Sequence, residues 1–268
     1  MSIPAAGPYV VPRARLKKPS RLLLLSEWRW MFEFGASLAA VPALFAARRG
    51  DGHAVLVIPG FLAGDLSTDM LRRFLTFLGY DTYGWELGNN FGGVYGMRAK
   101  LRARLEDLTR RSGRKVSVIG WSLGGVYARD LAISMPDAVR YVITLGSPFA
   151  NDLSATNAGR LYEMLSGESV STATPGDLEK LAGPLAVPTT SFYTKTDGIV
   201  NWRTCIVDES ANAENVEVLA SHIGLGVNPA VLWAVADRLG QPEGSFDAFD
   251  RGGPFALAYP RSGRSSQP

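Results

Sequence analysis

Between residues 50 and 240, short apolar runs alternate with stretches in which apolar residues recur at helical spacing. The short runs are rich in β-branched residues and end at turn-forming residues, as buried strands do. The longer stretches carry apolar residues on one face, which is typical of amphipathic helices. Strands are predicted over residues 53–58, 80–85, 115–120, 140–145, 188–194 and 215–219. Helices are predicted over residues 70–78, 97–108, 123–135 and 229–239.

This alternation predicts an α/β fold in which a mostly parallel sheet of about six strands is flanked by helices on both faces. The residues at the ends of the predicted helices support these boundaries. Gly79 and Gly113 stand where C-terminal caps are expected, and Asn228 followed by Pro229 is a typical helix start. We therefore interpret residues 51–240 as one domain.

Three segments depart from the alternation. Residues 149–187 are rich in Ser, Thr, Gly and Ala, and we interpret them as a lid or cap insertion. Residues 241–268 are rich in Gly, Ser, Pro and Arg and are expected to form a flexible C-terminal tail. Residues 1–50 are interpreted as an N-terminal hydrophobic helical segment.

The N-terminal segment is strongly apolar from residue 20 to residue 47, although Glu27, Arg29 and Glu33 interrupt it. Its uncharged part, residues 34–47, is shorter than the roughly 20 residues that a helix needs to span a bilayer. We expect one or two helices packed on the domain. The alternative is peripheral membrane contact through residues 20–47, with aromatic anchors and basic flanks at Lys17, Lys18, Arg48 and Arg49.

Charge and cysteine content narrow the classes of protein. Lys and Arg number 28 against 25 Asp and Glu, so the net charge is only +3 and nucleic-acid binding is not expected. Cys205 is the single cysteine, which excludes an internal disulfide and fits a reducing compartment. Residues 1–11 carry no Lys or Arg, so no secretory signal is predicted. We expect a cytoplasmic location, with membrane association left open.

A pentapeptide between the third predicted strand and the next helix, Gly120-Trp121-Ser122-Leu123-Gly124, has the pattern of a nucleophile elbow. The pattern alone is common, but its place directly between an apolar strand and a helix is the one that this turn requires. Glycines two residues before and after Ser122 permit a sharp turn, because a Cβ there would collide with the neighbouring strand and helix. Ser122 is therefore the candidate nucleophile.

A serine hydroxyl needs a base, and the chain has only two histidines. His53 opens the first strand, at the edge of the sheet opposite the elbow, because parallel strands carry their sites at their carboxyl ends. His222 follows the sixth strand, in the loop that enters the last helix. His222 is therefore the candidate base.

The histidine in turn needs an acid that fixes its tautomer and stabilises its charged form. Asp197 follows the strand at 188–194, which gives the chain order Ser122, Asp197, His222. Asp208 and Glu209 are competitors, but they lie well past the end of that strand.

Main-chain N–H groups that stabilise a developing oxyanion are expected at two places. Leu123, at the start of the helix after the nucleophile, supplies one of them. The loop after the first strand supplies the other, from Phe61 or, as the alternative, from Leu62.

Four motifs together resemble bacterial lipases and esterases of the α/β-hydrolase superfamily. They are Ile58-Pro59-Gly60-Phe61, Gly120-Trp121-Ser122-Leu123-Gly124-Gly125, Lys195-Thr196-Asp197-Gly198 and Ser221-His222-Ile223-Gly224. The resemblance covers residues 54–239 and keeps the motifs in the order of the family. Many relatives have His-Gly in the oxyanion loop, where this chain has Pro59-Gly60.

The resemblance implies the α/β-hydrolase fold and hydrolysis of a carboxylic ester through an acyl-enzyme on Ser122, with no metal or organic cofactor. The apolar residues Phe61, Leu62 and Trp121 favour a small-molecule ester with a hydrophobic acyl group. Acyl transfer to an alcohol and cleavage of a thioester or amide stay open on the same triad. A non-catalytic binding protein is a further alternative, although no triad member is missing. Serine at the elbow, in place of Asp, disfavours a haloalkane dehalogenase.

Overall fold

The computed structural model describes residues 16–150, 156–157 and 175–260. Six parallel strands form one sheet in the order β2-β1-β3-β4-β5-β6. They are β1 (Ala54–Ile58), β2 (Asp81–Gly84), β3 (Val116–Trp121), β4 (Val139–Leu145), β5 (Thr189–Tyr193) and β6 (Ala213–Glu217). The strand order reverses direction between β1 and β3. Open α/β sheets carry their binding crevice at such a switch point, outside the carboxyl ends of the strands.

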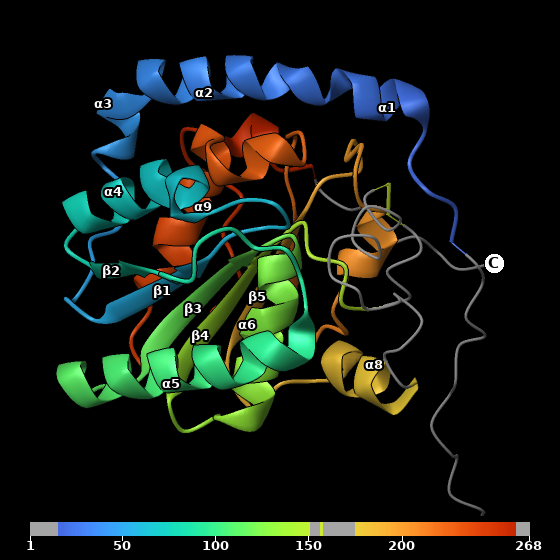
Figure 1. Cartoon of the computed structure of the whole chain (residues 1–268). Helices are drawn as coiled ribbons and strands as arrows, with labels where there is room; N and C mark the ends of the chain where they lie inside the picture. Colours follow the sequence, from blue (N-terminus) through green and yellow to red (C-terminus); the bar gives the residue numbers. More distant parts are fainter. Residues whose placement is uncertain (1–15, 151–155, 158–174, 261–268) are drawn as a thin grey trace, which may run out of the picture.

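Helices cover both faces of this sheet (Figure 1). One face is covered by α4 (Asp69–Phe77) and α9 (Pro229–Leu239), and the other by α5 (Val94–Ser112) and α6 (Leu123–Ser134). Alternate residues of β1 serve the two layers, because successive side chains of a strand point to opposite faces. Val55 and Val57 belong to the core beneath α4 and α9, whereas Leu56 and Ile58 belong to the core beneath α5 and α6. The predicted α/β fold with a parallel sheet is confirmed.

The N-terminal segment forms a row of short helices that lies outside the α4 and α9 layer, in blue in Figure 1. The elements are α1 (Arg21–Leu25), η1 (Ser26–Arg29), α2 (Trp30–Ala39) and α3 (Val41–Leu44). α2 contacts α9 and the turn η6 (Ile223–Gly226), and η1 contacts η6 as well. Among the helices described, none combines the length and the apolar character needed to cross a membrane.

The predicted strands agree with the observed ones to within two residues at each end. The predicted helix caps agree in part. Gly79 and Gly113 adopt the left-handed conformation, with φ of +98° and +64°, and the Asn228 side chain accepts a hydrogen bond from the N–H of Ala230. Gly240, which the sequence also places directly after the last helix, is right-handed with φ of −74° and is not a left-handed cap.

The prediction of a flexible C-terminal tail is wrong for residues 241–260. Phe249 and Tyr259 are buried in the core on the α9 side of the sheet. Their rings pack edge to face, with 4.9 Å between the ring centroids. The Tyr259 hydroxyl donates to the carbonyl of Ala230 at 2.7 Å. The Gly and Pro content of this segment reflects its turns, and its spaced aromatic residues anchor it. Residues 261–268 lie outside the described residues.

The predicted lid at residues 149–187 also lies largely outside the described residues. Within it, Thr156 pairs with Val200 in an isolated β-bridge, and α8 (Pro175–Ala182) contacts α6.

Candidate active site

Ser122 occupies a strained turn between β3 and α6. Its φ of 52° and ψ of −122° lie outside the regions that non-glycine residues favour, which costs roughly 1–3 kcal/mol. Its N–H donates to the carbonyl of Leu145 at 2.8 Å, which ties the turn to the end of β4. The surrounding packing holds the residue in a conformation that it would not adopt alone.

Three glycines make room for this turn. A Cβ on Gly120 would lie 2.3 Å from the carbonyl oxygen of Gly124, and a Cβ on Gly124 would lie 2.3 Å from the carbonyl oxygen of Ile58. A Cβ on Gly60, in the loop after β1, would lie 3.1 Å from the Cβ of Ser122. Helix α6, β3 and the β1 loop therefore meet at Ser122 more closely than side chains would allow.

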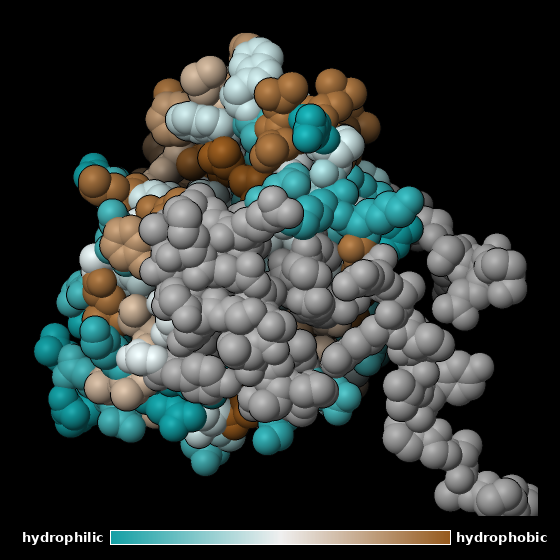
Figure 2. All heavy atoms as spheres, turned by 45° about the vertical axis from the view of Figure 1, so that its right-hand side comes forward, coloured by the Kyte–Doolittle hydropathy of each residue, from teal (hydrophilic) through white to brown (hydrophobic). Residues whose placement is uncertain are grey.

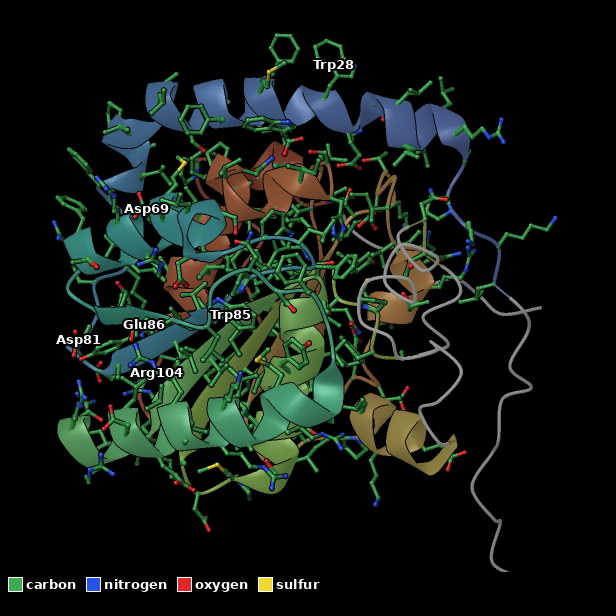
Figure 3. The ribbon with its side chains drawn as sticks, viewed as in Figure 1. Trp28, Asp69, Asp81, Trp85, Glu86 and Arg104 are labelled. Atoms are coloured by element: carbon green, nitrogen blue, oxygen red, sulfur yellow. The ribbon has the colours of Figure 1, made fainter. Side chains whose placement is uncertain are left out.

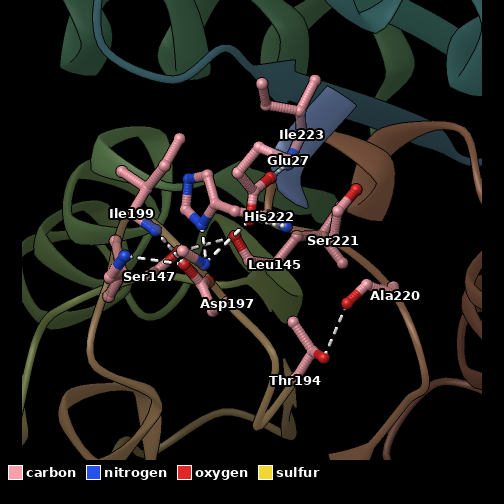
Figure 4. A network of polar contacts seen from close by, with 12 residues as sticks. Glu27, Leu145, Ser147, Thr194, Asp197, Ile199, Ala220, Ser221, His222 and Ile223 are labelled. Carbon is pink, nitrogen blue, oxygen red and sulfur yellow. Dashed lines mark hydrogen bonds and ion pairs between the residues drawn. The ribbon is translucent and has the colours of Figure 1, made fainter. Parts of the chain in front are cut away.

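His222 and Asp197 form a buried pair. The Nδ1 atom of His222 lies 2.6 Å from Oδ2 of Asp197, and both side chains are buried (Figure 4). The other carboxylate oxygen of Asp197 accepts the N–H groups of Ile199 and Val200 at 2.8 and 2.6 Å. These bonds hold the carboxylate in one orientation, and the carboxylate in turn directs Nε2 of the imidazole away from itself.

The charges around His222 raise its pKa above the ordinary histidine value. Burial opposes this, because it disfavours the charged imidazolium. The charge of Asp197, its hydrogen bond to the ring and the charge of Glu27 outweigh the burial. The site therefore favours the imidazolium that a general base becomes when it accepts a proton.

The alternatives to these two residues lie elsewhere. His53 is buried at the start of β1, where its ring contacts Asp51 Oδ1 at 2.5 Å and Ser117 Oγ at 2.9 Å. Asp208 and Glu209 are both exposed in the loop before β6. Asp197 is the acidic residue paired with His222.

The Ser122 loop and the His222 loop lie side by side. The indole N–H of Trp121 donates to the carbonyl of His222 at 3.2 Å, and a Cβ on Gly146 would lie 3.1 Å from Nδ1 of His222. In the part of the chain that the structure describes, no hydrogen bond joins the Ser122 hydroxyl to the imidazole. Such contacts are often long in free enzymes and shorten when substrate is bound.

The two predicted oxyanion donors flank Ser122. As the first residue of α6, Leu123 has an N–H group with no acceptor within the helix. Phe61 follows Gly60, which packs against Ser122. The alternative donor, Leu62, gives its N–H to the carbonyl of Asn90 at 2.7 Å, so that group is already engaged.

Two residues that the sequence analysis did not single out support these loops. Asn90 is fully buried, and its amide donates to the carbonyl of Pro59 at 2.9 Å, which fixes the predicted oxyanion loop. Glu27, from η1, accepts the N–H groups of Gly198 and His222. A buried asparagine in a Gly-rich loop leaves no distinctive pattern, but Glu27 is visible as a carboxylate within an apolar segment.

An apolar pocket of about 700 Å³ lies between the N-terminal helices and α4. Trp121 and Ile223, the neighbours of Ser122 and His222 in the chain, form part of its wall. The remaining wall is formed by Trp30, Phe34, Leu38, Leu66, Ser67, Asp69, Met70, Arg73 and Val227. Among the described residues, no cluster of His, Cys, Asp or Glu is placed to hold a metal ion.

No protein-family model matches this chain, and no curated protein matches it at a significant level. Solved structures do resemble it. Lipase B of Aspergillus fumigatus superposes with a TM-score of 0.59 at 18% identity, over 75% of this chain and 57% of that protein. The 2,6-dihydroxy-pseudo-oxynicotine hydrolase gives a TM-score of 0.56 at 19% identity, over 72% and 62%.

The mature lipase BlEst2 of Bacillus licheniformis gives a TM-score of 0.52 at 18% identity, over 74% of this chain and 94% of that protein. Together these likenesses establish the fold. The chain has the α/β-hydrolase fold, and it spans a little over half the length of the Aspergillus lipase.

The glycine at position 120 gives a direct test of the elbow geometry. Gly120→Ala should lower the free energy of unfolding by about 3 kcal/mol, because the new Cβ overlaps the backbone of α6. Gly96→Ala is the matched control, since Gly96 lies inside α5 with no atom near its Cβ position and should stabilise the protein by up to about 1 kcal/mol. Urea unfolding measures both. Equal stability of the two variants would contradict the close packing at the elbow.

Proposed function

We propose that this protein is a serine hydrolase that cleaves carboxylic esters, with Ser122, His222 and Asp197 as its catalytic triad. The observation that carries the proposal is the strained elbow at Ser122 beside the buried His222–Asp197 pair. Backbone strain of this kind persists where it serves a site. The α/β-hydrolase fold adds support, because lipases are among the structures that share it.

In the proposed reaction, the Ser122 hydroxyl attacks the ester carbonyl while Nε2 of His222 removes its proton. Asp197 holds the imidazole and stabilises its charged form. The N–H groups of Phe61 and Leu123 stabilise the tetrahedral oxyanion. His222 then gives its proton to the leaving alcohol. Water, activated by the same imidazole, releases the acid from Ser122 and restores the free hydroxyl.

The triad substitutions test this proposal with p-nitrophenyl esters as substrates. Ser122→Ala and His222→Ala should each lower kcat by about four orders of magnitude, and Asp197→Asn by a comparable factor. His53→Gln is the matched control and should keep kcat, because His53 lies at the other end of β1. Full activity in Ser122→Ala would overturn the proposal. If Asp208→Asn or Glu209→Gln lost activity while Asp197→Asn kept it, the catalytic acid would be that residue and not Asp197.

The same triad supports acyl transfer and thioester cleavage, which differ in the acceptor or in the leaving group. Product analysis with an added alcohol, beside a matched thioester substrate, separates these reactions from ester hydrolysis.

We further propose that the acyl group of the substrate is apolar and occupies the pocket bounded by Trp121 and Ile223. The pocket has the volume of typical small-molecule sites, and its wall is predominantly apolar. Each methylene that it removes from water would contribute roughly 0.8 kcal/mol to binding. A chain of several methylenes would therefore be preferred to acetate.

Filling the pocket tests where the acyl group binds. Met70→Trp, in the pocket wall on α4, should lower kcat/KM for an octanoyl ester at least tenfold relative to an acetyl ester. Phe77→Trp is the matched control, because Phe77 ends the same helix and does not line this pocket. An equal effect of Met70→Trp on both esters would contradict this position of the acyl chain.

We also propose that the outward face of the N-terminal helices contacts an anionic lipid surface. Its large apolar side chains are exposed, and Trp28 points away from the body of the molecule (Figure 3). Apolar residues gather at this end of the protein, at the top of Figure 2. The exposed apolar residues of the N-terminal segment are Leu22, Leu24, Leu25, Trp28, Met31, Phe32, Phe34, Leu38 and Phe45. Of these, Phe34 and Leu38 also line the pocket beneath the helices, and Phe45 stacks on Phe77 of α4.

Charge favours lipid as the partner of this face. Lys17, Lys18 and Arg21 are exposed at one end of the helical row, and Arg48 and Arg49 at the other. Trp and Phe beside basic residues are the composition of helices that lie in a membrane interface. The pocket shares Phe34 and Leu38 with this face, so an apolar ester could pass from the lipid surface to the site.

Vesicle binding tests the lipid contact with the full chain. The protein should co-sediment with phosphatidylcholine–phosphatidylglycerol vesicles, and the double variant Trp28→Ser, Phe32→Ser should lose at least tenfold in partition coefficient. Ile133→Ser is the control, because Ile133 is a partly exposed apolar residue on α6, across the sheet. Equal binding of all three proteins, or a concentration-dependent dimer that the double variant abolishes, would contradict a lipid partner.

A further inference from the structure

Two of the N-terminal elements, η1 and α2, have their polarity reversed. An ordinary surface helix buries its apolar face and exposes its charges. Here Glu27 and Ser37 are buried, whereas Trp28 and Phe32 are 56% and 66% exposed. A buried carboxylate needs partners, because burying an unpaired charge is costly. The buried carboxylate of Glu27 must therefore be held by hydrogen bonds to the part of the protein that it faces.

The partners of Glu27 are the two loops that carry the candidate acid and base (Figure 4). Its Oε1 atom accepts the N–H of Gly198, next to Asp197, at 2.8 Å and the N–H of His222 at 3.1 Å. Its Oε2 atom accepts the N–H of Ile223 at 3.0 Å. One carboxylate oxygen thus joins the acid loop to the base loop.

The rest of the inward face continues this arrangement. Glu33 accepts the N–H of Ser221 at 2.8 Å, and the guanidinium of Arg29 donates to the carbonyls of Thr196 and Ala220 at 2.8 and 2.9 Å. Arg29 and Glu33 also lie within 3.8 Å of each other. Both loops are therefore held from outside the sheet by the same short segment.

Two glycines allow this close approach. A Cβ on Gly198 would lie 2.4 Å from the carbonyl oxygen of Leu23, and a Cβ on Gly224 would lie 1.9 Å from Oε2 of Glu33. Each glycine stands within two residues of Asp197 or His222. The acid and base loops are thus shaped to receive the N-terminal segment.

We propose that Glu27 is a positioning residue of the triad, whose carboxylate fixes His222 and Asp197 relative to each other. This inference rests on the proposed function for its consequence in catalysis. The carboxylate suits the task because both of its oxygens accept hydrogen bonds. A glutamine would present one oxygen and one amide, and the amide would face a backbone N–H that is itself a donor.

The charge of Glu27 also acts on the imidazole. Among the described residues, the charged groups that contact His222 are Asp197, from the loop after β5, and Glu27, from η1. Arg29, from η1, and Glu33, from α2, contact the two residues before it, Ala220 and Ser221. Glu27 raises the pKa of His222, so its neutralisation should lower that pKa. The imidazole must be neutral to act as a base, so the acid limb of the kcat/KM profile should move to lower pH.

The experiment compares Glu27→Gln with the wild-type full chain and with Glu106→Gln, an exposed glutamate on α5. NMR follows the Cε1–H signals of the two histidines against pH, and His53→Gln assigns them. Glu27→Gln should lower the titration midpoint of His222 and leave that of His53 unchanged. It should also lower kcat about tenfold or more on p-nitrophenyl esters, with a smaller change in KM. Glu106→Gln should change none of these quantities.

The outcomes separate this inference from the proposed function. If Glu27→Gln leaves both the His222 midpoint and kcat unchanged, the positioning role is wrong, whatever Ser122 does. If the His222 midpoint falls but Ser122→Ala retains activity, the proposed function fails and the Glu27 contact stands. Glu27→Asp, which keeps the charge on a shorter side chain, should lower the titration midpoint of His222 less than Glu27→Gln does. A Glu27→Gln protein that loses activity only in proportion to lost folded fraction, judged by circular dichroism, also contradicts the inference.

Discussion

The close approach of β1, β3 and α6 at Ser122 is the constraint on which the rest of the site depends. Ser122 keeps its strained backbone because Gly120 and Gly124 let strand and helix approach to distances that no side chain would permit. The same approach brings the β1 loop against the serine and leaves the Leu123 N–H at an open helix start. The candidate nucleophile and the proposed oxyanion donors thus follow from one piece of backbone packing. That packing lies at the β1–β3 switch point, where open α/β sheets generally carry their binding crevice.

The candidate acid and base, Asp197 and His222, depend on a different constraint. They come from loops after β5 and β6, which are neighbours in the sheet but do not share the rigid elbow. Their mutual position is set by the Asp197–His222 bond and by the N-terminal segment outside. The segment's inward carboxylates and its outward aromatic residues are two sides of the same short helices. A displacement of these helices would therefore also displace the carboxylates that contact the loops of Asp197 and His222.

Much of this arrangement was predictable from the sequence because it follows local rules. The six strands are short apolar runs, and the elbow is a contiguous pattern whose glycines have a steric reason. His222 could be selected because only one other histidine exists, and His53 begins its strand at the wrong end of the sheet.

The parts that were missed depend on contacts between distant segments. Glu27 lies 195 residues before His222, whose N–H it accepts. The local spacing of apolar residues does not predict a contact between such distant positions. Its only sign was a charge placed inside an apolar run. The tail was misjudged because its Gly and Pro content outweighed two spaced aromatic residues, Phe249 and Tyr259, that complete the core. The composition of the segment is an average over all its residues, whereas its packing depends on these two aromatic side chains.

Covalent labelling tests whether Ser122 is an activated nucleophile, and it does so without knowledge of the natural ester. The folded protein is treated with a fluorophosphonate, digested, and analysed by peptide mass spectrometry. We expect one phosphonate adduct, on Ser122, that is lost in His222→Ala because the unassisted hydroxyl is a weak nucleophile. An unlabelled Ser122 in the folded wild-type protein, or an adduct of equal yield in His222→Ala, would contradict it.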